Sequence, residues 1–236
     1  MNLNLDEARY GKTFLLLFKV CAFTLRRVID NHHGRHGYTS LQDFLDKNKH
    51  NLYHILKRCC CCGFIQSSVT PMNWPQWNLL FIKNSSSCRT GYAVNCPYQV
   101  NCPCQYNAKP GITSDVMDIT LCCLVIKNIC SRHGGINMLH IETIREIRND
   151  LIHANSPCLD LHTFNGYWKD VKTALSGLAN HVPSAVYKDA LNMIQELETR
   201  VMDAYELGEI RKVIVDQNRI EKAEEVCTIF FIRMSF

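Results

Sequence analysis

The sequence predicts an all-α protein, a bundle of amphipathic helices interrupted by one irregular, cysteine-rich insert. Apolar residues recur at three- and four-residue spacing through most of the 236-residue chain, as they do on the buried faces of helices. Turn-forming clusters of Asn, Gly and Pro separate these stretches. Residues 59–112, between the second and third expected helices, lose the helical spacing and gain Cys, Pro and Gly.

Two helices are expected before the insert, near residues 11–30 and 40–58. The first ends at the turn-rich segment 31–37, and Thr39 or Ser40 can cap the second. The apolar run 14–25 is broken by Lys19 and is too short to span a bilayer. The first ten residues are charged, unlike a secretory signal. We therefore expect a cytoplasmic protein with no membrane partner.

Four helices are expected after the insert. Thr113 or Ser114 caps an apolar helix that ends before Gly134, and the next helix ends soon after Ala154, ahead of Pro157. Aromatic residues from Phe164 onward mark the third, and Pro183 starts the fourth. The apolar stripes of the second and fourth are Ile141, Ile144, Ile147 and Leu151, and Val186, Ala190, Ile194, Leu197 and Val201.

These elements suggest three parts of the chain. Residues 10–182 form the helical bundle, including the insert 59–112, and residues 183–226 form a C-terminal helical extension. Within this extension, Leu207, Ile210 and Ile214 make a short apolar seam, on a helix that either protrudes or coils with another. Residues 227–236 are an apolar tail.

The most informative segment is Arg148-Asn149-Asp150-Leu151-Ile152-His153, at the end of the second helix after the insert. An arginine's planar fork suits phosphate oxygens, a histidine exchanges protons near neutral pH, and an asparagine can orient either partner. Arg148 is expected on the flank of the apolar stripe. His153 lies about 140° around the helix from Arg148, so a shared site needs a bent helix end or a second chain. The alternative is that Arg148 pairs with Asp150 or Glu146 and His153 caps the helix.

The charge distribution is compatible with RNA as a partner. Residues 1–66 hold ten Lys and Arg against five Asp and Glu, whereas residues 138–236 hold eleven against fifteen. The front half is therefore basic although the whole chain carries only +4. Ordinary solvated helix faces explain most such lysines.

The fourteen cysteines point to free thiols or a metal, because no secretory signal accompanies them. Cys59 and Cys62 form the C-x2-C step that commonly begins a tetrahedral zinc site, and Cys102 with Cys104 is the expected second half. Zinc would stabilise an insert that has little apolar material of its own. A cysteine-rich loop without metal is the other interpretation. A catalytic zinc is not expected, since no H-E-x-x-H or H-x-E pattern is present.

Taken in order, several segments resemble a HEPN domain. They are Gln76 to Phe81, Met117 to Leu121, Lys127 to Cys130, Ile144 to Ala154 with its R-N-x-x-x-H motif, and Phe164 to Val171. The type most similar is that of the DAZ-interacting zinc-finger ubiquitin ligase and its invertebrate relatives. The resemblance covers roughly residues 10–182, and the ordered segments make it more specific than the R-N-x-x-x-H motif alone.

The resemblance implies an antiparallel helical bundle that forms a homodimer, with two R-N-x-x-x-H motifs facing one cleft. It also implies a metal-independent endoribonuclease in which His153 is the general acid and base. Arg148 would stabilise the transition state and Asn149 would orient the site. Arg145, one turn earlier, is a candidate phosphate contact by its position alone. The alternative is a non-catalytic RNA-binding or signalling module with protein partners, related to ubiquitin or innate immunity.

Overall fold

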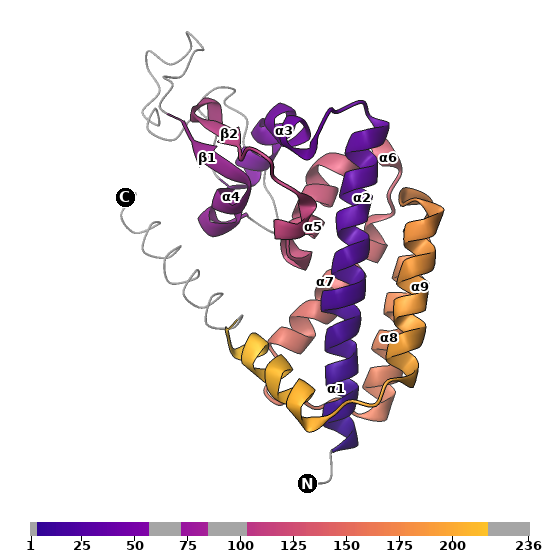
Figure 1. Ribbon diagram of the computed structural model, residues 1–236. Helices are drawn as coiled ribbons and strands as arrows, with labels where there is room; N and C mark the ends of the chain where they lie inside the picture. The colour runs from indigo at the N-terminus through magenta and orange to yellow at the C-terminus, as the bar shows by residue number, and fades with distance from the viewer. Residues whose placement is uncertain (1–3, 57–71, 85–102, 217–236) are drawn as a thin grey trace. The chain divides into compact units, whose positions relative to one another are not determined.

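The protein is mostly helical, as a computed structural model of the chain shows (Figure 1). The structure describes residues 4–56, 72–84 and 103–216. The predicted all-α class is confirmed, apart from one small two-stranded sheet. The chain forms two compact units, one of residues 1–28 and 136–236 and one of residues 29–135.

A long helical segment begins the first unit. It comprises α1 (Leu5–Leu15), a π-helical turn η1 (Leu16–Cys21) and α2 (Ala22–Arg35), which continues into the second unit. It starts before the predicted residue 11 because the Asn4 side chain caps it, accepting a hydrogen bond from the Asp6 backbone N–H. It also extends through most of the segment predicted to be a turn, and Gly37 with a φ of 72° follows it.

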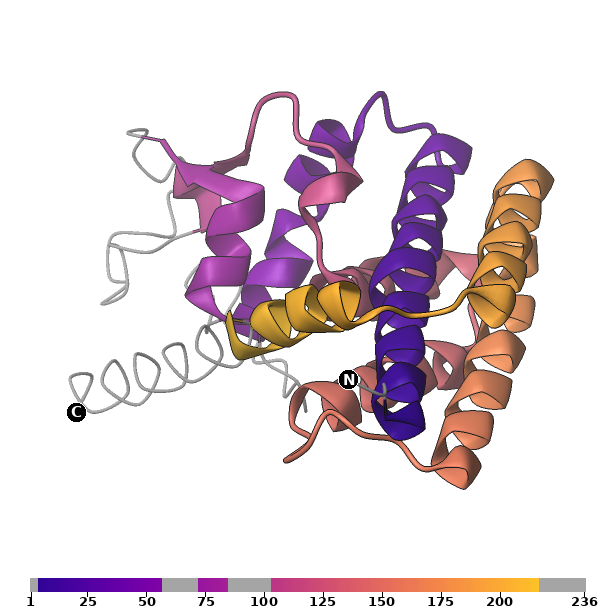
Figure 2. The same cartoon turned by 60° about the horizontal axis from the view of Figure 1, so that its bottom comes forward.

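Three further helices of the first unit pack around α1 and η1 (Figure 2). They are α7 (Met138–Ile152), α8 (Leu161–Gly177) and α9 (Ser184–Thr199), with the short turn η7 (Ala179–His181) joining the last two. The predicted stripe of α9 is buried at Ala190, Ile194 and Leu197. Val201 is 88% exposed instead, because α9 ends at Thr199 and the chain continues extended through Arg200.

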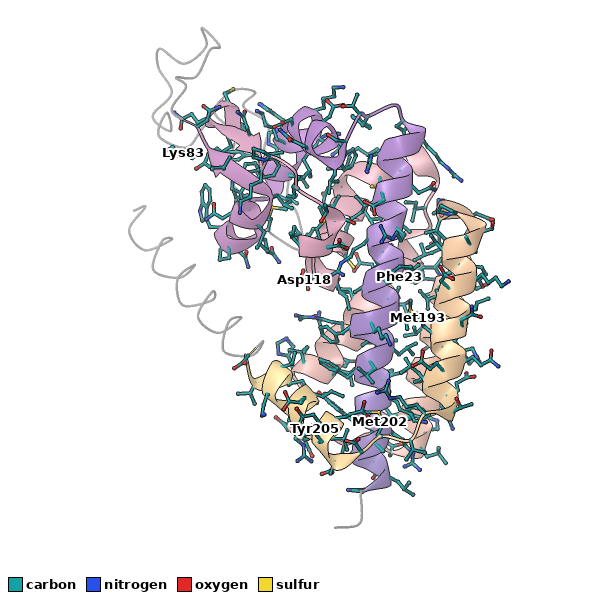
Figure 3. All side chains as sticks on the ribbon, in the orientation of Figure 1. Phe23, Lys83, Asp118, Met193, Met202 and Tyr205 are labelled. Carbon is teal, nitrogen blue, oxygen red and sulfur yellow. The ribbon has the colours of Figure 1, made fainter. Side chains whose placement is uncertain are left out.

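The C-terminal seam is buried against α1. Residues 204–216 are helical, and Leu207, Ile210 and Ile214 are all at most 9% exposed. A Cβ atom placed on Gly11 would lie 2.4 Å from Leu207 Cδ2 and 3.0 Å from Met202 Cε, the side chain that Figure 3 labels at this crossing. A glycine at position 11 therefore lets the C-terminal helix approach α1 closely.

We expect Gly11→Ala and Gly166→Ala to change stability in opposite directions. Gly166 lies inside α8, and the space that a methyl group would occupy there is open, so alanine should raise the free energy of unfolding by about 0.5–1 kcal/mol. At Gly11 the same methyl group must displace Leu207 and Met202, which costs roughly 1–3 kcal/mol. Urea unfolding of the two variants measures this difference. Equal stabilisation by both would show that the C-terminal helix does not pack on α1.

In the second unit, α3 (Leu41–Leu56) packs against α4 (Trp74–Leu80) and the strand β2 (Tyr106–Ala108), and β2 pairs with β1 (Phe81–Lys83). Ser40 caps α3, as predicted, by accepting from the Asp43 backbone N–H. The strands are antiparallel, with Ile82 opposite Asn107. Trp77 is fully buried and stacks on Phe81 with ring centroids 4.0 Å apart.

The described part of the expected irregular insert is thus partly ordered into a helix and a sheet, with the turn η4 (Pro103–Gln105) before β2. The sheet was not predicted because strands of three residues are too short to show an alternating pattern.

The remaining helices of the second unit are α5 (Ile119–Val125), the π-helical turn η6 (Ile126–Cys130) and α6 (Ser131–Gly134). The predicted cap at Thr113 or Ser114 is wrong for α5, since those residues flank or start a separate turn, η5 (Ser114–Val116). Asp118 caps α5 by accepting from the Leu121 backbone N–H at 2.8 Å. Gly135, with a φ of 60°, follows α6 in the left-handed conformation. Within the described residues, no helix is long and apolar enough to cross a membrane.

Candidate functional site

The motif helix α7 has the buried face that the sequence predicts, but it ends before the predicted end near Ala154. Asn137 caps its start, and Ile141, Ile144, Ile147 and Leu151 are all buried. The helix ends at Ile152, and His153 is the capping residue that follows. Since α7 packs against α8 and α1, the motif lies on a fixed element of the first unit.

Arg148 is buried, with only 4% of its surface exposed. The expectation that it lies on the flank of the apolar stripe is wrong. At about 100° per residue, Arg148 falls between Ile141 and Ile144 around the helix, and the buried Ile152 widens this face further. The arginine therefore sits among apolar side chains inside the protomer.

Arg148 and Asn149 are joined in the structure. Arg148 Nη1 donates to Asn149 Oδ1 at 3.2 Å, and Asn149 is partly exposed. This contact fixes the amide oxygen toward the arginine, which leaves the amide NH₂ as the donor that Asn149 can offer elsewhere. The buried cation also raises the positive potential at Asn149, because the protein interior screens charge weakly.

His153 is exposed at the end of α7. Its backbone N–H bonds to the carbonyls of Asn149 and Leu151, so the helix end itself sets its position. Arg145 is partly exposed and forms an ion pair with Glu142, its Nε lying 2.6 Å from the carboxylate. A phosphate at Arg145 would have to compete with this carboxylate.

Two tyrosines hold the end of α7. Tyr10 of α1 is 2% exposed and donates its hydroxyl to the Leu151 carbonyl at 2.7 Å. Tyr167 of α8 donates to Asp150 Oδ2 at 2.9 Å. The last turn of α7 is thus bonded to both neighbouring helices, and so is the backbone that carries His153.

The Tyr10 contact gives a prediction about stability at alkaline pH. Burial raises the pKa of Tyr10 to about 12 from its usual value near 10. The folded state therefore favours the protonated phenol, so the stability that Tyr10 contributes is complete below pH 10 and is lost as pH rises toward 12. We expect Tyr10→Phe to lower the free energy of unfolding by about 1 kcal/mol at pH 7 and to reduce its decline above pH 10. Urea titrations at pH 7, 10 and 11.5 test this, and an equally steep decline in the variant would contradict it.

The predicted zinc site lies almost entirely outside the described residues. Cys59, Cys62 and Cys102 lie outside the described residues. Of the four predicted ligands, only Cys104 is described, as a half-buried thiol in η4. Among the described residues, no three His, Cys, Asp or Glu side chains are grouped to hold a metal ion. Structural zinc stays a prediction.

The structure also brings together a basic groove that sequence reasoning missed. Lys12 of α1, Lys169 and Lys172 of α8 and Glu198 of α9 line a space of about 760 Å³, together with Phe164 and Trp168. The α8 members share one helix face and could have been found by their spacing. Lys12 and Glu198 could not, because 186 residues separate them in the sequence.

Glu198 joins the three helices of this groove. Its carboxylate accepts from Lys172 Nζ at 2.8 Å and from Trp168 Nε1 at 3.1 Å, and its backbone carbonyl accepts from Lys12 Nζ at 3.0 Å. The hydrogen bonds from Lys172 and Trp168 lower the pKa of Glu198. The carboxylate is therefore ionised at neutral pH, and it holds the indole and one lysine in fixed positions.

The two regions of the first unit offer different chemistry. The end of α7 provides an exposed imidazole and an amide supported by a buried cation, which suits proton transfer next to an anion. The groove provides ammonium groups beside aromatic rings. Comparison of the chain with models of protein families, with curated proteins and with solved structures finds no match.

Proposed function

We propose that residues 10–182 form a HEPN-type RNA-processing domain that acts as a metal-independent endoribonuclease. One observation carries the proposal. The exposed His153 follows Asn149 by about one helical turn, and Asn149 is bonded to the buried cation of Arg148. A proton-transfer group and a positive potential are thus present at the same helix end.

The reaction would be attack of a ribose 2′-hydroxyl on the adjacent phosphorus. The 2′-oxygen bonds to phosphorus, the bond to the 5′-oxygen breaks, and the proton lost from the 2′-hydroxyl is balanced by one gained by the 5′-oxygen. His153 would transfer these protons. Arg148 and Asn149 would stabilise the charge that develops on the phosphate oxygens, Asn149 by direct contact and Arg148 through its charge.

A homodimer would complete this site. Each protomer exposes one His153 at the end of α7, so a second copy of α7 facing it would supply a second imidazole on the opposite side of the phosphate. The Arg148 of each protomer is covered and would act through its charge. Sedimentation of the wild-type protein measures the dimer fraction at each protein concentration. The cleavage rate per protein molecule should rise with that fraction.

The direct test is incubation of the purified protein with end-labelled single-stranded RNA in EDTA. Fragments ending in cyclic phosphates are expected, together with 5′-hydroxyl ends on the downstream products. Products with other termini would contradict the proposed reaction, because only attack by the neighbouring 2′-hydroxyl produces a cyclic phosphate.

A second candidate function is a non-catalytic RNA-binding or signalling module. The burial of Arg148 favours it, since a guanidinium that is 4% exposed cannot grip a phosphate with its fork in the isolated protomer. This candidate predicts saturable binding of RNA or a protein partner without any turnover. Binding through phosphates should weaken steeply as salt rises, and binding that is insensitive to salt would contradict the RNA version.

A further inference from the structure

The groove formed by α1, α8 and α9 carries a net positive charge. Lys12, Lys169 and Lys172 contribute three ammonium groups, and Glu198 contributes one carboxylate. Lys12 and Lys172 bond to Glu198, whereas the exposed Lys169 ammonium has no carboxylate partner within the described part of the chain. The groove therefore suits an anionic ligand, and Lys169 is the cation best placed to meet it.

Aromatic rings form one wall of the groove. Phe164 and Trp168 have ring centroids 5.1 Å apart, and Phe164 is half-buried, so part of its ring is accessible. The Trp168 indole is held by its bond to Glu198. The buried Trp168 thus supports the partly exposed ring of Phe164. An accessible aromatic ring next to lysines is typical of sites that stack a base while contacting the phosphate backbone.

The groove is long rather than compact. The residues of α8 that line it extend from Phe164 to Ser176, which is about 18 Å along a helix. Asn165, Thr173 and Ser176 add an amide and two hydroxyl groups along the same face. The Thr173 hydroxyl already donates to the Lys169 carbonyl, but the Asn165 amide and the Ser176 hydroxyl can donate to sugar and phosphate oxygens. An extended ligand therefore fits better than a small ion.

We propose that this groove binds a segment of single-stranded RNA. The lysines contact phosphates, led by Lys169, and Phe164 packs against a base. The inference rests on the proposed function, because RNA is the anionic substrate of the proposed endoribonuclease. An acidic peptide would satisfy the charge but would leave the aromatic wall without a flat partner.

The groove is distinct from the end of α7. Tyr167, which bonds to Asp150 of α7, precedes Lys169 by two residues and so points about 160° away from it around α8. Binding in the groove can therefore be changed without altering the contacts that hold His153. This separation makes the groove testable independently of cleavage.

The test measures the affinity for an oligouridylate of about ten nucleotides by fluorescence anisotropy at several salt concentrations. All proteins carry His153→Ala, so that the probe is not cut during the measurement. We expect Lys169→Ala to weaken binding roughly fivefold at low salt. The slope of log affinity against log salt should fall by about 0.7, the value for one phosphate contact in a single strand.

Lys188→Ala is the matched control, because Lys188 is an exposed lysine of α9 outside the groove. It should leave both the affinity and the salt slope unchanged. Phe164→Leu keeps an apolar side chain but loses the stacking surface, and it should weaken binding without changing the slope. Equal slopes for Lys169→Ala and Lys188→Ala, or equal affinity for an oligoglutamate probe, would overturn the proposal.

The proposal about the groove and the proposal of endoribonuclease activity can be refuted independently. If the wild-type protein never cuts RNA but Lys169→Ala lowers the salt slope of binding, the groove proposal is supported and the endoribonuclease proposal is wrong. If the protein cuts RNA while the groove variants bind as tightly as the controls, the groove proposal is wrong and the nuclease assignment is unaffected.

Discussion

Replacing His153 with alanine is expected to reduce RNA cleavage by roughly 10²- to 10⁴-fold, which is the usual contribution of a positioned general acid or base. The imidazole is exposed at the end of α7, so its loss should leave the fold intact. Cleavage of end-labelled single-stranded RNA in EDTA measures the effect. Circular dichroism and urea unfolding confirm that the variant is folded.

His162→Ala is the matched control for this variant. His162 is also exposed and lies in the first turn of α8, a few residues further along the chain. It should retain full activity. If His153→Ala cuts RNA as fast as the control, His153 has no part in the chemistry and the assignment fails.

Replacing Arg148 with methionine is expected to separate stability from activity. The arginine lies within the apolar face of α7, where methionine can occupy a similar volume without a charge to bury. We expect the variant to stay folded, with a free energy of unfolding within about 2 kcal/mol of the wild-type value, because apolar packing is kept while the hydrogen bond to Asn149 is lost. Cleavage should nevertheless fall by about 100-fold or more, because the positive charge behind Asn149 is lost.

Arg145→Met is the control for Arg148→Met. It removes an arginine one turn away whose guanidinium is paired with Glu142 at the partly exposed surface. Only a small change in cleavage is expected, because Glu142 already occupies this guanidinium. Full activity in Arg148→Met would show that the buried arginine has a structural role only and takes no part in the cleavage reaction.

The helices could be predicted from the sequence because their signals are local. Apolar spacing identifies the buried faces of α7, α8 and α9, and Ser40 caps α3 as expected. The errors are local as well. Several residues near 113–118 can cap a helix, and only the backbone geometry decides that Asp118 does so.

The candidate site was only partly predictable because its support comes from distant residues. Spacing places Asn149 and His153 near one helix end. It cannot show that Tyr10 bonds to Leu151, which lies 141 residues away. The burial of Arg148 follows from helix geometry, but a charged residue in an apolar arc is ordinarily expected to lie at its edge. The basic groove depends on Lys12 meeting Glu198, which no local pattern reveals.

The discontinuous first unit has a consequence for synthesis on the ribosome. When residues 1–135 have been made, the second unit is complete in sequence, but the first unit has only its opening helix. The remaining 101 residues need roughly 5–20 s at ordinary elongation rates. During that interval Phe14, Leu17 and Val20 lack α7, α8 and α9, the helices that pack around α1 and η1 in the finished protein. Until α7, α8 and α9 have been made, the nascent chain therefore presents an apolar helix that chaperones can bind.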